Sequence, residues 1–129
     1  MDHTRLDQRA LDAALRLFTA SFVVDDKRTQ IHKRLLTAER RAETLETLPR
    51  WLAGRTAPLE GADKSPAGLR KRMGELVGVR VAADGAARMT IADALERSRT
   101  AASVFIADNG NVALVTQVDG GPPILCSRL

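Results

Sequence analysis

The pair Asn109-Gly110 constrains the fold of this chain most, because it separates two apolar runs in the C-terminal third of the sequence. A type I′ hairpin turn needs a positive φ at both of its central residues, and Asn followed by Gly adopts that conformation most readily. The sequence therefore predicts two antiparallel strands, near residues 103–107 and 112–118, joined at this turn. The chain has 129 residues, so the hairpin places a small antiparallel sheet near its C-terminal end.

A third strand is expected near residues 124–128, after a second turn at 119–121. Pro122 and Pro123 have no backbone N–H to donate, so this segment is expected at a sheet edge or at the start of a strand. Apolar residues fall on both faces of the predicted strands: Val104, Ile106, Val112, Leu114, Val115 and Val118. Such a sheet must be covered on both faces, either by two layers of helices or by one helical layer and a second subunit.

The first part of the chain has helical periodicity. Thr4 with Asp7 three residues later predicts a helix start, and the apolar stripe that follows predicts a helix from about residue 5 to 22. A second helical stretch covers about 27–48, and Thr37 is a candidate cap inside it. This stretch therefore forms either one helix or two helices with a bend.

The middle of the chain predicts a loop and then a helix. Residues 53–65 are rich in Gly, Pro and small polar side chains, which indicates a loop. Ser65-Pro66 starts a helix, with Ser as the N-cap and Pro in the first helical position. Leu69, Met73, Leu76 and Val77 supply its buried face. Gly78 is expected to end this helix.

Two short elements are expected before the terminal sheet. Residues 79–81 are a candidate strand, and Asp84-Gly85 after them is a candidate turn. Thr90, with Asp93 three residues later, predicts the N-cap of a short helix.

Together these elements predict an α+β fold. It consists of an N-terminal helical pair, a long loop, and two shorter helices packed on a C-terminal three-stranded antiparallel meander. A chain of this length is expected to form a single domain over residues 1–129. Its helical part covers about 4–52, its loop 53–65 and its mixed α/β part 66–129.

The side chains that most often carry catalysis are few. The chain has two histidines, His3 and His32, and one cysteine, Cys126. No metal-ligand spacing or glycine-rich phosphate loop accompanies them, so the sequence assigns no catalytic, metal-binding or cofactor-binding residue. An enzyme that uses Cys126 with His32 is the least favoured of three hypotheses, because a free cysteine is more often a small buried apolar residue.

The cysteine content and the lengths of the apolar stretches indicate in which compartment the protein is expected. A single cysteine suits a reducing compartment. The N-terminal residues are charged throughout, without the apolar segment of a secretory signal, and no apolar stretch is long enough to span a membrane. The sequence therefore predicts a cytoplasmic protein with no membrane partner.

Basic residues gather in two segments of the chain, whose net charge is +4. Residues 25–55 hold eight basic and five acidic residues, and residues 64–88 hold six basic and two acidic ones. The candidate contacts for a polyanion or an acidic partner are Arg40, Arg41, Arg70, Lys71 and Arg72. Nucleic-acid binding through them requires that both clusters share one face of the fold. Arg supplies 16 of the 20 basic residues, a bias that GC-rich coding also produces, so the basic character is weak support for this function.

The sequence favours a small cytoplasmic protein, of bacterial origin and without enzymatic activity, that acts by contact with other proteins. A second copy of the chain is one expected partner, because a sheet that is apolar on both faces needs cover. Nucleic-acid binding through the basic helical faces is the alternative.

Overall fold

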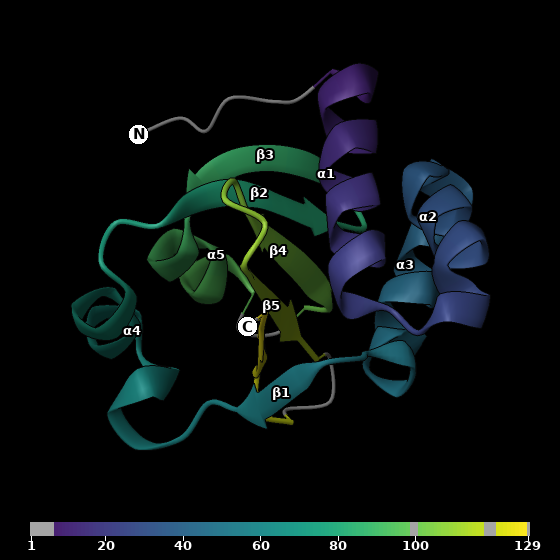
Figure 1. Cartoon of the computed structure of the whole chain (residues 1–129). Coiled ribbons are helices and arrows are strands. Elements are labelled where there is room, and N and C mark those ends of the chain that lie inside the picture. The colour runs from purple at the N-terminus through teal and green to yellow at the C-terminus, as the bar shows by residue number, and fades with distance from the viewer. Residues whose placement is uncertain (1–6, 99–100, 118–120, 129) are drawn as a thin grey trace.

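The computed structural model of the chain describes residues 7–98, 101–117 and 121–128. An antiparallel sheet of six strands runs through the molecule in the order β1-β6-β5-β4-β2-β3 (Figure 1). The strands are β1 (Arg55–Pro58), β2 (Val77–Ala82), β3 (Gly85–Thr90), β4 (Ser103–Ala107), β5 (Val112–Thr116) and β6 (Ile124–Ser127). The predicted α+β fold is confirmed, whereas the predicted three-stranded meander, β4-β5-β6, is only half of the sheet.

Helices cover both faces of this sheet (Figure 1). One layer consists of α1 (Gln8–Phe22), α2 (Arg28–Leu36) and α3 (Ala38–Thr47), and the other of α4 (Pro66–Met73) and α5 (Ile91–Arg97). Single turns of 3₁₀ helix occur at 25–27, 48–51 and 61–64. Of the two predicted ways to cover the sheet, the structure has two layers of helices, so this sheet does not need a second subunit to bury its apolar side chains.

Each face of the sheet has its own apolar core. On the first face, Phe18 and Phe22 of α1 are fully buried with Val104 of β4. On the second face, Leu69 of α4 is fully buried in the cluster that contains Phe105 of the same strand. Successive residues of a strand point to opposite faces, which is why both runs of the predicted hairpin are apolar throughout.

The predicted caps of the two shorter helices are confirmed. The Ser65 hydroxyl accepts the backbone N–H of Gly68 at the start of α4, and the Thr90 hydroxyl accepts that of Asp93 at the start of α5. At the first helix the cap is Asp7, whose carboxylate accepts the backbone N–H of Ala10. The predicted cap Thr4 lies outside the described residues.

The second helical stretch is two helices with a break at Thr37, the second of the two predicted possibilities. Thr37 has extended backbone angles (φ −93°, ψ 118°), and its hydroxyl donates to the carbonyl of Lys33 rather than capping the next helix. The break lets α3 turn back and pack beside α2.

Two predictions for the middle of the chain are wrong. The segment 53–65 is not only a loop, because it contains β1, which pairs with β6 at one end of the sheet. The helix after Ser65 ends at Gly74 (φ 71°), not at Gly78. Gly78 lies in β2 beside β4, where a Cβ would come within 2.1 Å of the carbonyl oxygen of Ile106. A close approach between strands, not a helix end, requires glycine there.

The predicted Asn-Gly hairpin forms, but its turn is not type I′. Gly110 has a positive φ of 72°, and within the described part of the chain only glycines have one, which excludes the type I′ conformation at Asn109. The N–H of Gly110 donates to the carbonyl of Ala107, and the side-chain oxygen of Asn109 accepts the N–H of Asn111. Asn109 thus stabilises the turn through its side chain rather than through a left-handed backbone.

One of the two positions predicted for the segment with Pro122 and Pro123, a sheet edge or the start of a strand, is confirmed. β6 begins at Ile124, directly after Pro123, so the prolines precede a strand. β6 lies between β5 and β1 and is not an edge. The predicted turn at 119–121 falls mostly outside the described residues. Among the described helices, none is both long and apolar enough to cross a membrane.

Candidate interaction surface

The sheet ends in two strands, β1 and β3, each with a neighbour on one side only among the described residues. An edge strand presents unpaired N–H and C=O groups, which proteins usually protect by short length, charge or proline. The two edges of this sheet differ in how far they are protected.

The outer edge of β1 is short and contains a proline. The N–H of Leu59 donates to the carbonyl of Pro123, and alternate residues of an antiparallel strand bond to the same neighbour. Thr56 and Pro58 therefore point their backbone groups away from the sheet. Because proline has no N–H, Thr56 offers the one outward donor of this strand.

The outer edge of β3 is longer and has no proline. The N–H of Ile91 donates to the carbonyl of Leu76. Together with the register of β2 and β3, this bond shows which residues of β3 hydrogen-bond to β2 and which point away from it. The odd-numbered residues of β3 therefore bond to β2. Ala86 and Arg88 point N–H and C=O groups outward. Thr90 offers its N–H alone, because the carbonyl of this N-cap residue accepts the first hydrogen bond of α5 (Ile91–Arg97). Among the described strands none pairs with this side of β3, so three N–H groups and two C=O groups are open.

The side chains along this edge are small, with one charged group. Ala86 packs against the core under α1, and Arg88 is exposed. Arg88 forms a two-pronged ion pair with Asp108, in which Nη1 lies 3.0 Å from Oδ1 and Nη2 bonds to Oδ2. This pair crosses the sheet from β3 to the turn after β4, so the Arg88 side chain is held in place.

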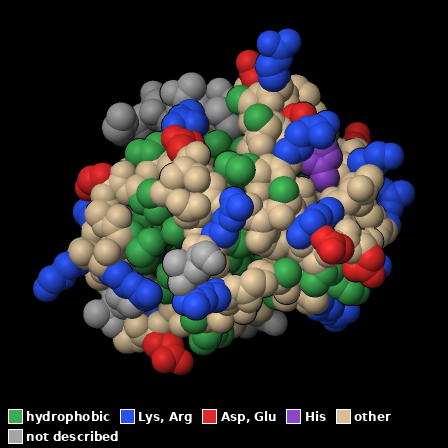
Figure 2. All heavy atoms as spheres, in the orientation of Figure 1, with side chains coloured by type: hydrophobic (Ala, Val, Ile, Leu, Met, Phe, Trp, Pro, Cys, Tyr) green, Lys and Arg blue, Asp and Glu red, His purple; other side chains and the backbone are tan. Residues whose placement is uncertain are grey.

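The predicted basic residues do not form one surface. Arg70, Lys71 and Arg72 form the exposed last turn of α4, in one helical layer, whereas Arg40 is exposed on α3 in the other layer (Figure 1). Arg70 also pairs with Glu75 at 3.4 Å. In Figure 2 the Lys and Arg side chains are spread across the visible face, with Asp and Glu between them. The condition for nucleic-acid binding through both clusters, a shared face, is not met by this placement.

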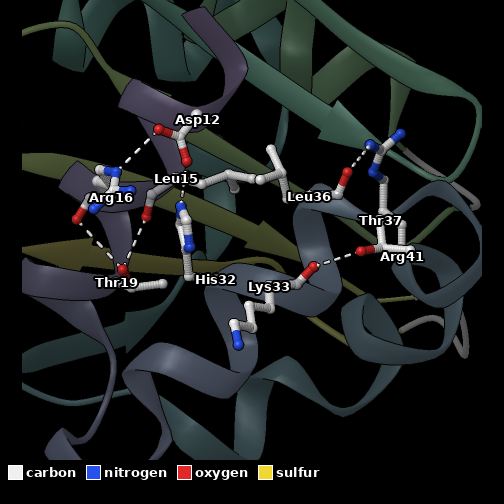
Figure 3. A network of polar contacts seen from close by, with 9 residues as sticks. All are labelled: Asp12, Leu15, Arg16, Thr19, His32, Lys33, Leu36, Thr37 and Arg41. Carbon is white, nitrogen blue, oxygen red and sulfur yellow. Dashed lines mark hydrogen bonds and ion pairs between the residues drawn. The ribbon is translucent and has the colours of Figure 1, made fainter. Parts of the chain in front are cut away.

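Arg41, the fifth predicted contact, is buried (Figure 3). Its Nε donates to the carbonyl of Leu35 at 2.7 Å, and its Nη2 lies 3.4 Å from the carbonyl of Leu36. These are the last carbonyls of α2, where the helix dipole favours a cation. Arg41 therefore joins α2 to α3 and is not accessible to a partner.

His32 belongs to an inter-helix contact (Figure 3). Its Nε2 lies 2.7 Å from a carboxylate oxygen of Asp12 on α1, and the other oxygen accepts Nε of Arg16 at 3.0 Å. The bond from Arg16, with that from His32, lowers the pKa of Asp12 against the opposing effect of desolvation. This arrangement ties α2 to α1.

Cys126 is fully buried in the core on the α1 side of the sheet. Burial raises the pKa of its thiol to about 12. A thiol that stays protonated near neutral pH is a poor nucleophile, so these surroundings favour a packing role.

A chain of polar contacts crosses the end of the sheet between two hollows of about 430 and 580 Å³. Nε of Arg80 donates to the Ser98 hydroxyl at 2.8 Å, and the Ser103 hydroxyl is 2.7 Å from those of Ser98 and Thr116. Thr116 donates in turn to the carbonyl of Ala101. Each of these groups has a hydrogen-bond partner within the chain. The contacts therefore hold β2, α5, β4 and β5 together.

Comparisons with protein-family models, with curated proteins and with solved structures found no match to this chain.

Proposed function

We propose that this chain is a protein-interaction module that binds a strand of its partner along the outer edge of β3. The observation that carries the proposal is the open backbone of Ala86, Arg88 and Thr90. In strand addition, main-chain hydrogen bonds supply affinity and neighbouring side chains supply selectivity. β3 offers both, with three outward N–H groups, two outward C=O groups and a charged side chain beside them.

The rigidity of β3 supports this proposal. Its inner side pairs with β2 over six residue pairs, from Val77–Thr90 to Ala82–Gly85, and β2 pairs in turn with β4. An edge that is already held extended loses little conformational entropy when a second strand is added. The small side chains of the outward residue Ala86 and its neighbour Gly85 let another backbone approach closely.

The test compares proline variants at the two edges. Ala86→Pro removes one outward N–H of β3, and Thr56→Pro removes the one outward N–H of β1 as the matched control. Each variant and the wild type are tagged and captured, after mild cross-linking, from cells that express the chain. The proposal expects specific cross-linked proteins with the wild type and with Thr56→Pro, and their loss with Ala86→Pro. Capture that is equal for both variants would show that β3 is not the docking element.

A further inference from the structure

One of the two hollows at the end of the sheet is lined by charged side chains from several elements. Its volume is about 430 Å³, and small-molecule sites in proteins usually measure about 300–1,000 Å³. α3 forms one wall, and residues 82–84 and 101–102 form others. Arg80 of β2 and Arg97 of α5 contribute two guanidinium groups. The fold therefore brings two basic side chains to one hollow that is large enough for a small molecule.

Arg80 is partly buried, and no carboxylate of the described residues lies at salt-bridge distance from it. Its Nε donates to the Ser98 hydroxyl, and its Nη2 lies 3.4 Å from the backbone carbonyl of Arg97, so both of these acceptors are neutral. Burial lowers the pKa of Arg80, while the negative charge of Asp84 opposes this shift and the like charge of Arg97 adds to it. A cation taken partly out of water costs free energy unless an anion compensates it, so an anion in the hollow would be stabilised.

The Arg80 guanidinium is held in position with donors to spare. A guanidinium has five N–H donors, and the bonds to Ser98 and to the Arg97 carbonyl use two of them. The Ser98 hydroxyl is itself buried and lies 2.7 Å from that of Ser103, which fixes the orientation of the group. The planar fork of an arginine matches the paired oxygens of a carboxylate or a phosphate.

The other side chains of the hollow limit the size and the chemistry of a ligand. Glu46 and Asp84 are exposed and line the same hollow, so they repel an extended polyanion such as nucleic acid while leaving room for one compact acid group. Ala42 and Leu45 of α3 supply an apolar wall. This combination favours a small molecule with an acid group at one end and an apolar body.

We propose that this hollow binds a small organic oxyanion, either a carboxylate or a phosphate monoester, whose acid group lies between Arg80 and Arg97. The inference goes beyond the proposed function and does not depend on it, because none of the outward residues of β3 lines the hollow.

The first test is a titration of the full chain, labelled with ¹⁵N, followed by NMR. The probes are benzoate, phenyl phosphate and the neutral benzyl alcohol. The proposal expects saturable shifts of the amides at 80–84 and 101–102 with at least one of the two anions and none with benzyl alcohol. The anion that binds more tightly identifies the acid group. Failure of both anions to bind, or shifts spread over the basic surface without saturation, would overturn the proposal.

The second test removes one of the two charges. Arg97 is exposed and makes no salt bridge within the described residues, so Arg97→Gln is expected to keep the fold. It is expected to raise the Kd of the bound anion about tenfold, the effect of losing a hydrogen bond to a charged group. Arg50→Gln removes an equal charge from an exposed position outside the hollow and is expected to leave the Kd unchanged. Equal effects of the two variants would show that net charge, not this site, attracts the anion.

The third test fills the hollow without changing a charge. Ala42→Leu extends a side chain into it from an exposed position of α3, and Ala38→Leu makes the same change on α3 outside the hollow. Ala42→Leu is expected to weaken anion binding, whereas Ala38→Leu is expected to bind as the wild type does. Wild-type affinity in Ala42→Leu would contradict the placement of the ligand body beside α3 and overturn the proposed site.

Discussion

Arg40 and Arg41 are adjacent in α3, yet their surroundings are opposite. Arg40 is exposed, whereas the Arg41 guanidinium is buried against the final carbonyls of α2. The side chains of neighbouring helical residues point about 100° apart. Arg40 therefore faces solvent while Arg41 faces the core. A cluster of charges in the sequence therefore does not define a surface until the helix has been oriented.

The role of Arg41 predicts a large effect on stability. Arg41→Met keeps the apolar stem but leaves the buried carbonyls of Leu35 and Leu36 without their donor. We expect the free energy of unfolding to fall by about 2 kcal/mol, the range for a hydrogen bond to a charged group. Arg40→Met is the matched control and is expected to change it by less than about 0.5 kcal/mol. Urea denaturation measures both, and equal effects would contradict the structural role of Arg41.

Asp12 predicts a difference in acid stability. Its hydrogen bond from Arg16, together with that from His32, lowers its pKa below the usual 3.8. A carboxyl group with a lowered folded-state pKa contributes stability above its unfolded pKa and loses that contribution as the pH falls through the folded value. Below 3.8 the unfolding free energy of the wild type should therefore decline more steeply than that of Asp12→Asn. Denaturation curves at a series of acidic pH values test this, and parallel declines would refute it.

At the scale of elements, the sequence predicted the structure best where local signals and burial agree. Ser65 and Thr90 are caps because their side chains can accept a backbone N–H three residues on, which is a local property. β4 and β5 were predicted because both of their faces are buried and their residues are accordingly apolar.

The two edge strands were missed for the opposite reason. β1 reads Arg-Thr-Ala-Pro and is exposed throughout, so its sequence has no apolar alternation. It forms a strand because its backbone hydrogen-bonds to β6. β3 reads Gly-Ala-Ala-Arg-Met-Thr, which is poor in residues that favour strands. The candidate turn at Asp84-Gly85 was the one signal for β3, because a turn after a strand predicts a second strand. The candidate interaction surface was missed along with these strands.

The alternation along β3 predicts that neighbouring proline substitutions differ in effect. Ala87 bonds to Arg80 of β2 across the ladder, so Ala87→Pro is expected to lower the free energy of unfolding by about 2–3 kcal/mol. Ala86 points its N–H away from the sheet, and Ala86→Pro is expected to leave the fold intact. Thermal unfolding compares the two variants, and a reversed order would contradict the assignment of the outer edge.

At the scale of the whole molecule, the two helical layers mean that no partner is needed to cover the apolar faces of the sheet. The sequence favoured a second copy as cover for a two-faced sheet, but the helices of the chain already cover both faces. What the described residues leave open is the backbone at the end of the sheet. The proposed interaction with a partner therefore rests on hydrogen bonding at an edge of the sheet, not on apolar cover.

Hydrogen exchange of the β3 amides tests the central claim most directly. In dilute solution the account predicts slow exchange for Ala87 and Met89, which bond to β2, and fast exchange for Ala86, Arg88 and Thr90. The amide of Thr56, which points outward at the β1 edge, is expected to exchange fast as well. Slow exchange at Ala86, Arg88 and Thr90 even at the highest dilution would contradict the account, because it would mean that the outer edge of β3 is never open.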